Sequence, residues 1–108
     1  MAEHQDKEFE EMQVLEQQLH NILLQKQSFQ MELSETQSAL KEIESSGDEI
    51  FKLVGQLLLK VEKKKTTEEL KNKEKIIELR LKSLDKQENS LTERIDSLRE
   101  KILGSMNK

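Results

Sequence analysis

The side chains of this sequence that could do chemistry are its two histidines and its 22 carboxylates. A metal site needs ligands that converge, but His4 and His20 are too far apart on a helix to share one metal ion. The carboxylates recur three and four residues from lysines and arginines, which is the spacing of surface ion pairs along a helix. The sequence contains no glycine-rich phosphate loop and no serine or cysteine nucleophile motif. We therefore expect no enzyme activity, no metal ion and no cofactor.

The composition is typical of a long helical protein rather than of a compact enzyme. Charged residues make up 37% of the 108 residues and hydrophobic ones 33%, with three aromatic residues and no proline. A net charge of -4, without a basic face or stacking aromatics, argues against binding to nucleic acid or to a membrane surface. The chain has no cysteine, its N-terminus is acidic, and its longest apolar stretch is far below the about 20 residues that span a bilayer. We expect a single domain, located in the cytoplasm.

Two stretches repeat apolar residues at alternating steps of three and four, which predicts two helices that pair through a seam. The first helix is expected over 7–46, ended by Gly47 in a left-handed conformation. The second is expected over 66–104, beginning at a capping box formed by Thr66 and Glu69. The seam positions of the first helix are Met12, Leu15, Leu19, Ile22, Lys26, Phe29, Leu33, Thr36, Leu40 and Ile43. Those of the second are Leu70, Glu74, Ile77, Leu81, Leu84, Glu88, Leu91, Ile95, Leu98 and Ile102.

Between the two helices lies a β-hairpin signal over 50–61. Two short apolar runs flank Gly55-Gln56, and a two-residue loop with glycine first suits a type II′ turn. A lone hairpin is marginal in water and leaves two strand edges unpaired, so either the helices of the same chain or other chains must cover it. Because the helices use their apolar faces on each other, we expect other chains. The residues expected to form this oligomerisation surface are Ile50, Phe51, Leu53, Val54, Gly55, Leu57, Leu58, Leu59 and Val61.

The hairpin turns the second helix back along the first, so the two helices are expected to run antiparallel. The predicted fold is mainly α: a long antiparallel two-helix coiled coil with one β-hairpin between the helices. Lys26 and Glu88 interrupt the two seams at comparable distances from the turn, in adjacent layers that long side chains can bridge. They either select the register of the helices or are two polar residues that reach outward to water. Thr36 and Glu74 weaken the seam nearer the hairpin.

Several apolar residues far from the hairpin fall outside the best seam layers. An antiparallel pair brings the start of the first helix beside the end of the second, and an apolar surface that contains methionine accepts varied partners. The alternative is a frayed terminus with incidental hydrophobic residues. The residues expected to contact a partner at this end are Phe9, Met12, Leu15, Leu98, Ile102, Leu103 and Met106.

Three sequence elements resemble a known family in order and spacing. They are the stretch LLQKQSFQMELSETQSALKEIE over 23–44, the hairpin FKLVGQLLLK over 51–60, and the DKQE segment over 85–88. The chain resembles the beta-type subunit of prefoldin, the hexameric co-chaperone of archaea and eukaryotes, over nearly its whole length. Any two heptad sequences look alike, so the order of helix, glycine-turn hairpin and helix makes the resemblance specific.

The resemblance implies an assembly of two alpha-type and four beta-type subunits, whose hairpins join into β-barrels that form a platform for six coiled coils. It also implies that unfolded polypeptides are held at the free ends of the coiled coils and delivered to a group II chaperonin without ATP. On this chain, the platform strands would lie in 50–61, and the seven residues at the helix ends would contact the client. The alternatives are a coiled-coil scaffold or tether that links specific partners, and a parallel-dimer adaptor.

Overall fold

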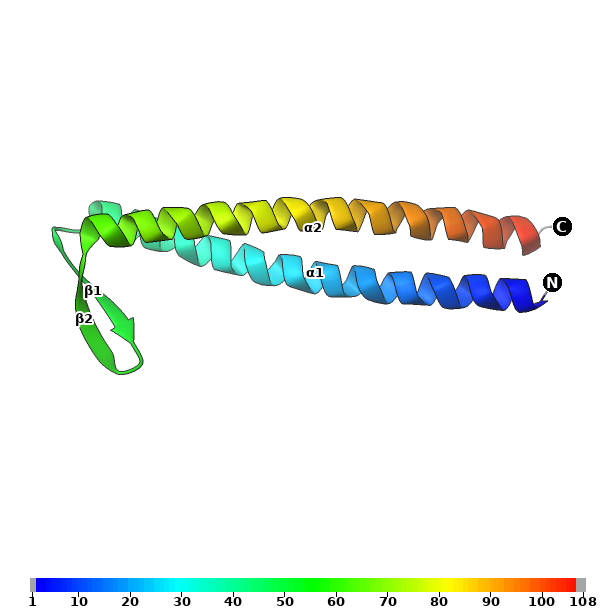
Figure 1. The fold of residues 1–108 in the computed structure, drawn as a ribbon, viewed down its shortest axis with the longest axis horizontal. Helices are drawn as coiled ribbons and strands as arrows, with labels where there is room; N and C mark the ends of the chain where they lie inside the picture. The colour runs from blue at the N-terminus through cyan, green and yellow to red at the C-terminus, as the bar shows by residue number, and fades with distance from the viewer. Residues whose placement is uncertain (1, 107–108) are drawn as a thin grey trace. The chain divides into compact units, whose positions relative to one another are not determined.

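The computed structural model describes the backbone of residues 2–106 and the side chains of residues 6–106. Its elements follow one another in the order α1 (Ala2–Ser45), β1 (Glu49–Val54), β2 (Leu57–Glu62) and α2 (Lys63–Met106), as Figure 1 shows. This order confirms the predicted fold of two long helices with one hairpin between them.

The chain divides into two compact units, which we describe separately. The terminal unit contains residues 2–28 of α1 and 82–106 of α2, and the hairpin unit contains residues 29–81. In the terminal unit, Glu11 pairs with Arg94 at 3.8 Å and Lys26 pairs with Asp85 at 2.7 Å. Residues that come later in α1 thus meet residues that come earlier in α2, so the two helical segments of this unit run antiparallel.

The predicted end of α1 is nearly correct, but its mechanism is different. The helix ends at Ser45, and Gly47 does not adopt a left-handed conformation, since Gly55 is the only glycine with a positive φ among the described residues. The amide N–H of Ser46 donates to the carbonyl of Ile43 at 3.2 Å, and the Ser46 hydroxyl donates to the same oxygen at 2.7 Å. Lys63 Nζ donates to the Ser46 carbonyl at 2.9 Å, so the start of α2 helps to satisfy the end of α1.

The predicted start of α2 is wrong. The helix begins at Lys63 directly after β2, without an intervening loop, so Thr66 lies inside the first turns and the expected capping box with Glu69 does not open the helix. The hydroxyl of Thr67 instead donates back to the Lys63 carbonyl at 2.8 Å, as threonines inside helices commonly do. The helix also continues past the predicted end at Gly104 to Met106.

Burial within the seam is concentrated in the terminal unit. Among residues 6–106, eight apolar side chains are buried, and all but Ile77 belong to the terminal unit. Those seven are Leu15, Ile22, Leu84, Leu91, Ile95, Leu98 and Ile102. The hairpin unit instead buries a polar seam residue, Thr36, whose hydroxyl donates to the Glu32 carbonyl at 2.8 Å. Because a buried aliphatic side chain contributes about 1.5 to 3 kcal/mol, the terminal unit holds most of the hydrophobic stabilisation of the coiled coil.

The hairpin of the hairpin unit has the predicted turn. Its strands pair antiparallel from Glu49 opposite Glu62 to Val54 opposite Leu57, which leaves Gly55 and Gln56 as the loop. Gly55 has a φ of 60° and no residue other than glycine has a positive φ in the part of the chain described. Positive φ at the first loop position alone is the signature of a type II′ turn.

Candidate functional site

The hairpin presents a large apolar surface that its own chain does not cover. Of the expected oligomerisation residues, only Ile50 and Val61, which face each other at the base of the hairpin, are half-buried. The exposed ones are Phe51, Leu53, Val54, Gly55, Leu57, Leu58 and Leu59. The possibility that the helices of the same chain cover the hairpin is therefore wrong. An exposed two-stranded sheet with apolar side chains on both faces requires other strands or helices against it.

The seven residues expected at the helix ends of the terminal unit differ in how exposed they are. Phe9, Leu103 and Met106 are exposed, with 42%, 53% and 64% of their surfaces accessible, and Met12 is half-buried. Leu15, Leu98 and Ile102 are buried in the seam, where a partner cannot reach them while the helices stay paired. We name Phe9, Leu103 and Met106 the terminal apolar surface. The three buried residues support this surface by holding the helices together.

The seam of the terminal unit contains a charged cluster, which we name the Lys26 cluster. Lys26 Nζ lies 2.7 Å from an Asp85 carboxylate oxygen and 2.6 Å from a Glu88 carboxylate oxygen. The hydrogen bond to Asp85, followed by that to Glu88, raises the pKa of Lys26 above its ordinary value. Lys26 and Glu88, expected in adjacent layers within bridging distance, do form an ion pair, so these two side chains do not reach outward to water alone. Asp85 was not predicted, although its position three residues before Glu88 places both carboxylates on one face of the helix.

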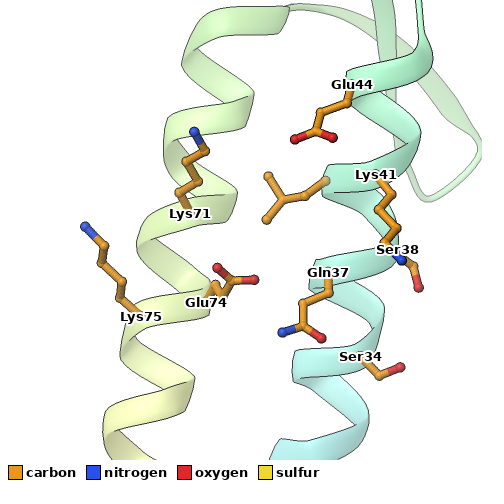
Figure 2. Close-up of a pocket in the computed structure, with 9 residues that line it drawn as sticks. Ser34, Gln37, Ser38, Lys41, Glu44, Lys71, Glu74 and Lys75 are labelled. Atoms are coloured by element: carbon orange, nitrogen blue, oxygen red, sulfur yellow. The ribbon is translucent and has the colours of Figure 1, made fainter.

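A groove in the hairpin unit surrounds a second polar seam position, Glu74, which differs from Lys26 in having no oppositely charged partner among the described side chains. The groove encloses about 620 Å³ and runs between Gln37 and Glu44 of α1 and Lys71 and Glu74 of α2. Figure 2 shows the Glu74 carboxylate directed toward α1. Within residues 6–106, no cation pairs with Glu74, so this seam position lacks the compensation that Lys26 has. All the residues that line the groove except Leu40 are polar or charged.

Two further properties of the described residues bear on metal binding and on membranes. No three histidine or carboxylate side chains among them converge in a way that could hold a metal ion. Neither helix contains a stretch that is both long enough and apolar enough to cross a membrane.

The comparison with protein-family models shows to which family this chain belongs. The model described as prefoldin subunit matches residues 6–107, which is almost the entire sequence. The chain belongs to the prefoldin subunit family. The resemblance seen in the helix–hairpin–helix pattern is therefore confirmed.

The relatives of this prefoldin-family chain carry the name of the beta-type subunit. It is 45% identical to prefoldin subunit beta of Thermococcus onnurineus over 89 residues, which cover 81% of this chain and 77% of the relative. It is 38% identical to prefoldin subunit beta of Pyrococcus horikoshii over 98 residues, covering 89% and 84% of the two chains. The crystal structure of the prefoldin beta subunit from Thermococcus strain KS-1 matches with a TM-score of 0.87 and 36% identity, over 97% of this chain and 94% of that one.

Membership of this family has two consequences for the surfaces described above. Prefoldin subunits form a co-chaperone family, and they assemble with other prefoldin subunits. The exposed hairpin is therefore a surface of the kind that such assembly requires, and the terminal apolar surface is a separate one at the other end of the helices in the sequence.

Proposed function

We propose that this chain is one subunit of an ATP-independent holdase, a co-chaperone that binds unfolded polypeptides and passes them to a group II chaperonin in the cytoplasm. In this proposal the hairpin joins alpha-type subunits and other beta-type copies in a hetero-hexamer with a β-barrel platform. The terminal apolar surface contacts the client. The chain needs no catalytic residue, metal ion or cofactor for this work, since binding and release depend on surface contacts alone.

The observation that supports client binding most directly is the exposure of Phe9, Leu103 and Met106 beside a seam that is otherwise closed. The neighbouring seam residues are buried, so these three exposed side chains contribute little to the packing between the helices. Unfolded polypeptides differ from folded ones in presenting apolar side chains, and an apolar surface with a flexible methionine adapts to many of them. Each such contact is weak, and several copies in one assembly raise the overall affinity without any new contact.

The test replaces the terminal apolar surface by serine, in the variant Phe9→Ser/Leu103→Ser/Met106→Ser. We expect at least about tenfold more of this variant to be needed to suppress aggregation, because each half-exposed side chain can contribute about 1 kcal/mol to a client contact. The measurement is light scattering of guanidinium-denatured citrate synthase diluted into buffer that contains the assembled protein.

A matched control is Leu24→Ser/Ile76→Ser/Leu79→Ser, whose three side chains are exposed to similar extents of 52%, 54% and 67%. This control should suppress aggregation like the wild type. If both variants suppress aggregation equally well, clients do not bind at the terminal apolar surface. If the wild type itself fails to suppress aggregation, the holdase function is wrong for this chain.

A further inference from the structure

The start of α1, next to the exposed Phe9, is an acidic segment. Residues 6–16 contain five carboxylates against one lysine, a net charge of -4, and the formal net charge of the complete chain is also -4. The facing end of α2, residues 93–106, contains three acidic and three basic side chains and is neutral. Phe9, one of the three residues of the terminal apolar surface, therefore lies within a segment that carries a charge as large as that of the whole protein.

Three of these carboxylates form no ion pair with the side chains that the structure describes. Glu11 pairs with Arg94 at 3.8 Å, whereas Asp6, Glu10 and Glu16 are exposed and form no ion pair within residues 6–106. The two arginines at this end of α2 have other partners: Arg94 pairs with Glu11, and Arg99 lies 3.5 Å from Asp96 on its own helix. The three carboxylates are thus available to a bound partner.

The periodicity of the helix places these charges around Phe9. Asp6 precedes Phe9 by three residues and Glu16 follows it by seven, so both lie on the same face of α1 as the ring. Glu10 is its direct neighbour. An apolar contact centred on Phe9 would therefore bring the flanking residues of a bound polypeptide within several ångströms of two or three carboxylates. Charges at this range interact across water at physiological salt, where the Debye length is about 8 Å.

We propose that the terminal apolar surface selects unfolded segments in which apolar side chains are flanked by lysine or arginine, and discriminates against segments flanked by aspartate or glutamate. This inference rests on the proposed function and specifies its substrate class. Apolar contact supplies affinity for unfolded chains in general, and the unpaired carboxylates add attraction or repulsion according to the charge of the flanks. A lysine flank can also lay its methylene stem along Phe9 while its ammonium group reaches a carboxylate.

The experiment uses the full-length chain and three fluorescently labelled unfolded peptides with identical apolar residues and either lysine, serine or glutamate flanks. At about 0.05 M salt we expect the lysine-flanked peptide to bind about tenfold more tightly than the glutamate-flanked one, with the serine-flanked peptide between them. At about 0.5 M salt the three affinities should converge to within about twofold, because the carboxylates are then screened. Fluorescence anisotropy titrations give the dissociation constants.

The variant Asp6→Asn/Glu10→Gln/Glu16→Gln should abolish the preference while it keeps affinity for the serine-flanked peptide. The control Glu35→Gln/Glu68→Gln/Glu78→Gln removes the same charge from exposed, unpaired positions of the hairpin unit and should keep the preference. Equal affinities of the wild type for all three peptides, or equal loss of preference in both variants, would overturn the charge selectivity and leave the holdase function intact. Failure of every peptide to bind would overturn both.

Discussion

At the scale of single residues, Lys26 occupies an unusual place for a charged group. Its side chain is 19% exposed in a seam of leucines and isoleucines, and the two carboxylates that hold it are 57% and 28% exposed. Because Asp85 and Glu88 favour the charged form in the folded chain, the pKa of Lys26 is raised on folding. A raised pKa of a lysine stabilises the fold at every pH below the unfolded-state value, and that contribution disappears as the pH rises through the folded-state value.

The raised pKa of Lys26 leads to a prediction of how stability depends on pH. Compared with Lys26→Met, the wild type should keep a constant difference in free energy of unfolding up to about pH 9.5, and it should lose stability relative to the variant above about pH 10.4, the usual lysine pKa. Urea unfolding followed by circular dichroism at several pH values measures the difference. The control Lys86→Met removes an exposed lysine of the terminal unit that makes no ion pair there. Parallel curves for wild type and Lys26→Met would contradict the prediction.

The sequence was enough to place Lys26 and Glu88 in adjacent layers, because heptad positions fix the depth of each polar residue in an antiparallel seam, but it left open whether the two side chains pair or reach outward to water. The sequence was not enough to tell which residues at the helix ends are exposed and which are buried between the helices. Leu15 and Leu98 are apolar, as Leu103 is, and only the actual pairing of the helices decides that the first two are buried and the third exposed. The exposure of a side chain depends on how the two helices pack together, and the heptad pattern of one helix does not determine it.

At the scale of elements, the Lys26 cluster bears on the register of the terminal unit. An apolar seam that repeats every seven residues tolerates a shift by one heptad, since leucine then replaces leucine. Such a shift would place Lys26 opposite Leu81 or Ile95 in place of Glu88. In the shift toward Ile95, Thr92 would replace Asp85 and the amine would lie in the seam without a carboxylate, which is costly. In the shift toward Leu81, Glu78 would replace Asp85 and the amine would keep one carboxylate in place of two. We therefore expect the cluster to favour the observed pairing over its shifted alternatives.

The hairpin depends on one backbone conformation. Gly55 has a φ of 60°, and a Cβ there would meet no heavy atom within 4 Å, so the penalty for a side chain is purely conformational. Gly55→Ala should destabilise the hairpin by about 1 kcal/mol, which is the usual cost of the left-handed region for an L-residue. We expect weaker assembly with an alpha-type partner, measurable as a higher dissociation constant by analytical ultracentrifugation. Gln56→Ala, which needs no positive φ, serves as the control, and equal effects of the two substitutions would contradict this explanation.

The ends of the helices were the least predictable elements. Thr66 and Glu69 form a convincing capping box in the sequence, yet α2 begins three residues earlier because β2 leads into it without a loop. Similarly, Gly47 follows α1, but Ser46 already donates two hydrogen bonds to the Ile43 carbonyl, and the helix ends without a left-handed glycine. Local signals identify that a helix starts or stops nearby, whereas the connection to the neighbouring strand decides where.

At the scale of the whole molecule, the proposal assigns assembly and client binding to different parts of the chain. Leu53 and Leu58 face each other across the hairpin and are both exposed. The variant Leu53→Lys/Leu58→Lys should therefore lose assembly with an alpha-type partner, since two ammonium groups would have to enter an apolar interface. Light-scattering mass of the mixture should fall from that of a hexamer to those of small species.

The control for this experiment is Ile76→Lys/Leu79→Lys, which adds the same charges to exposed positions of α2 outside the hairpin. It should still form the hexamer. A stable dimer for both the wild type and the hairpin variant would mean that the helices associate by themselves, and the coiled-coil scaffold would then become the better description of this chain.

The exposed hairpin also has a consequence for the supply of subunits in a cell. A newly made chain that has not met its companions displays Phe51, Leu53 and Leu58 to solvent, and these are the kind of side chains that a holdase captures. If the proposed holdase function is right, an orphan copy would compete with clients for completed assemblies, and surplus production of one subunit would act as an inhibitor. Under the proposed function, balanced synthesis of the subunits would therefore help to set how much client the assemblies can hold.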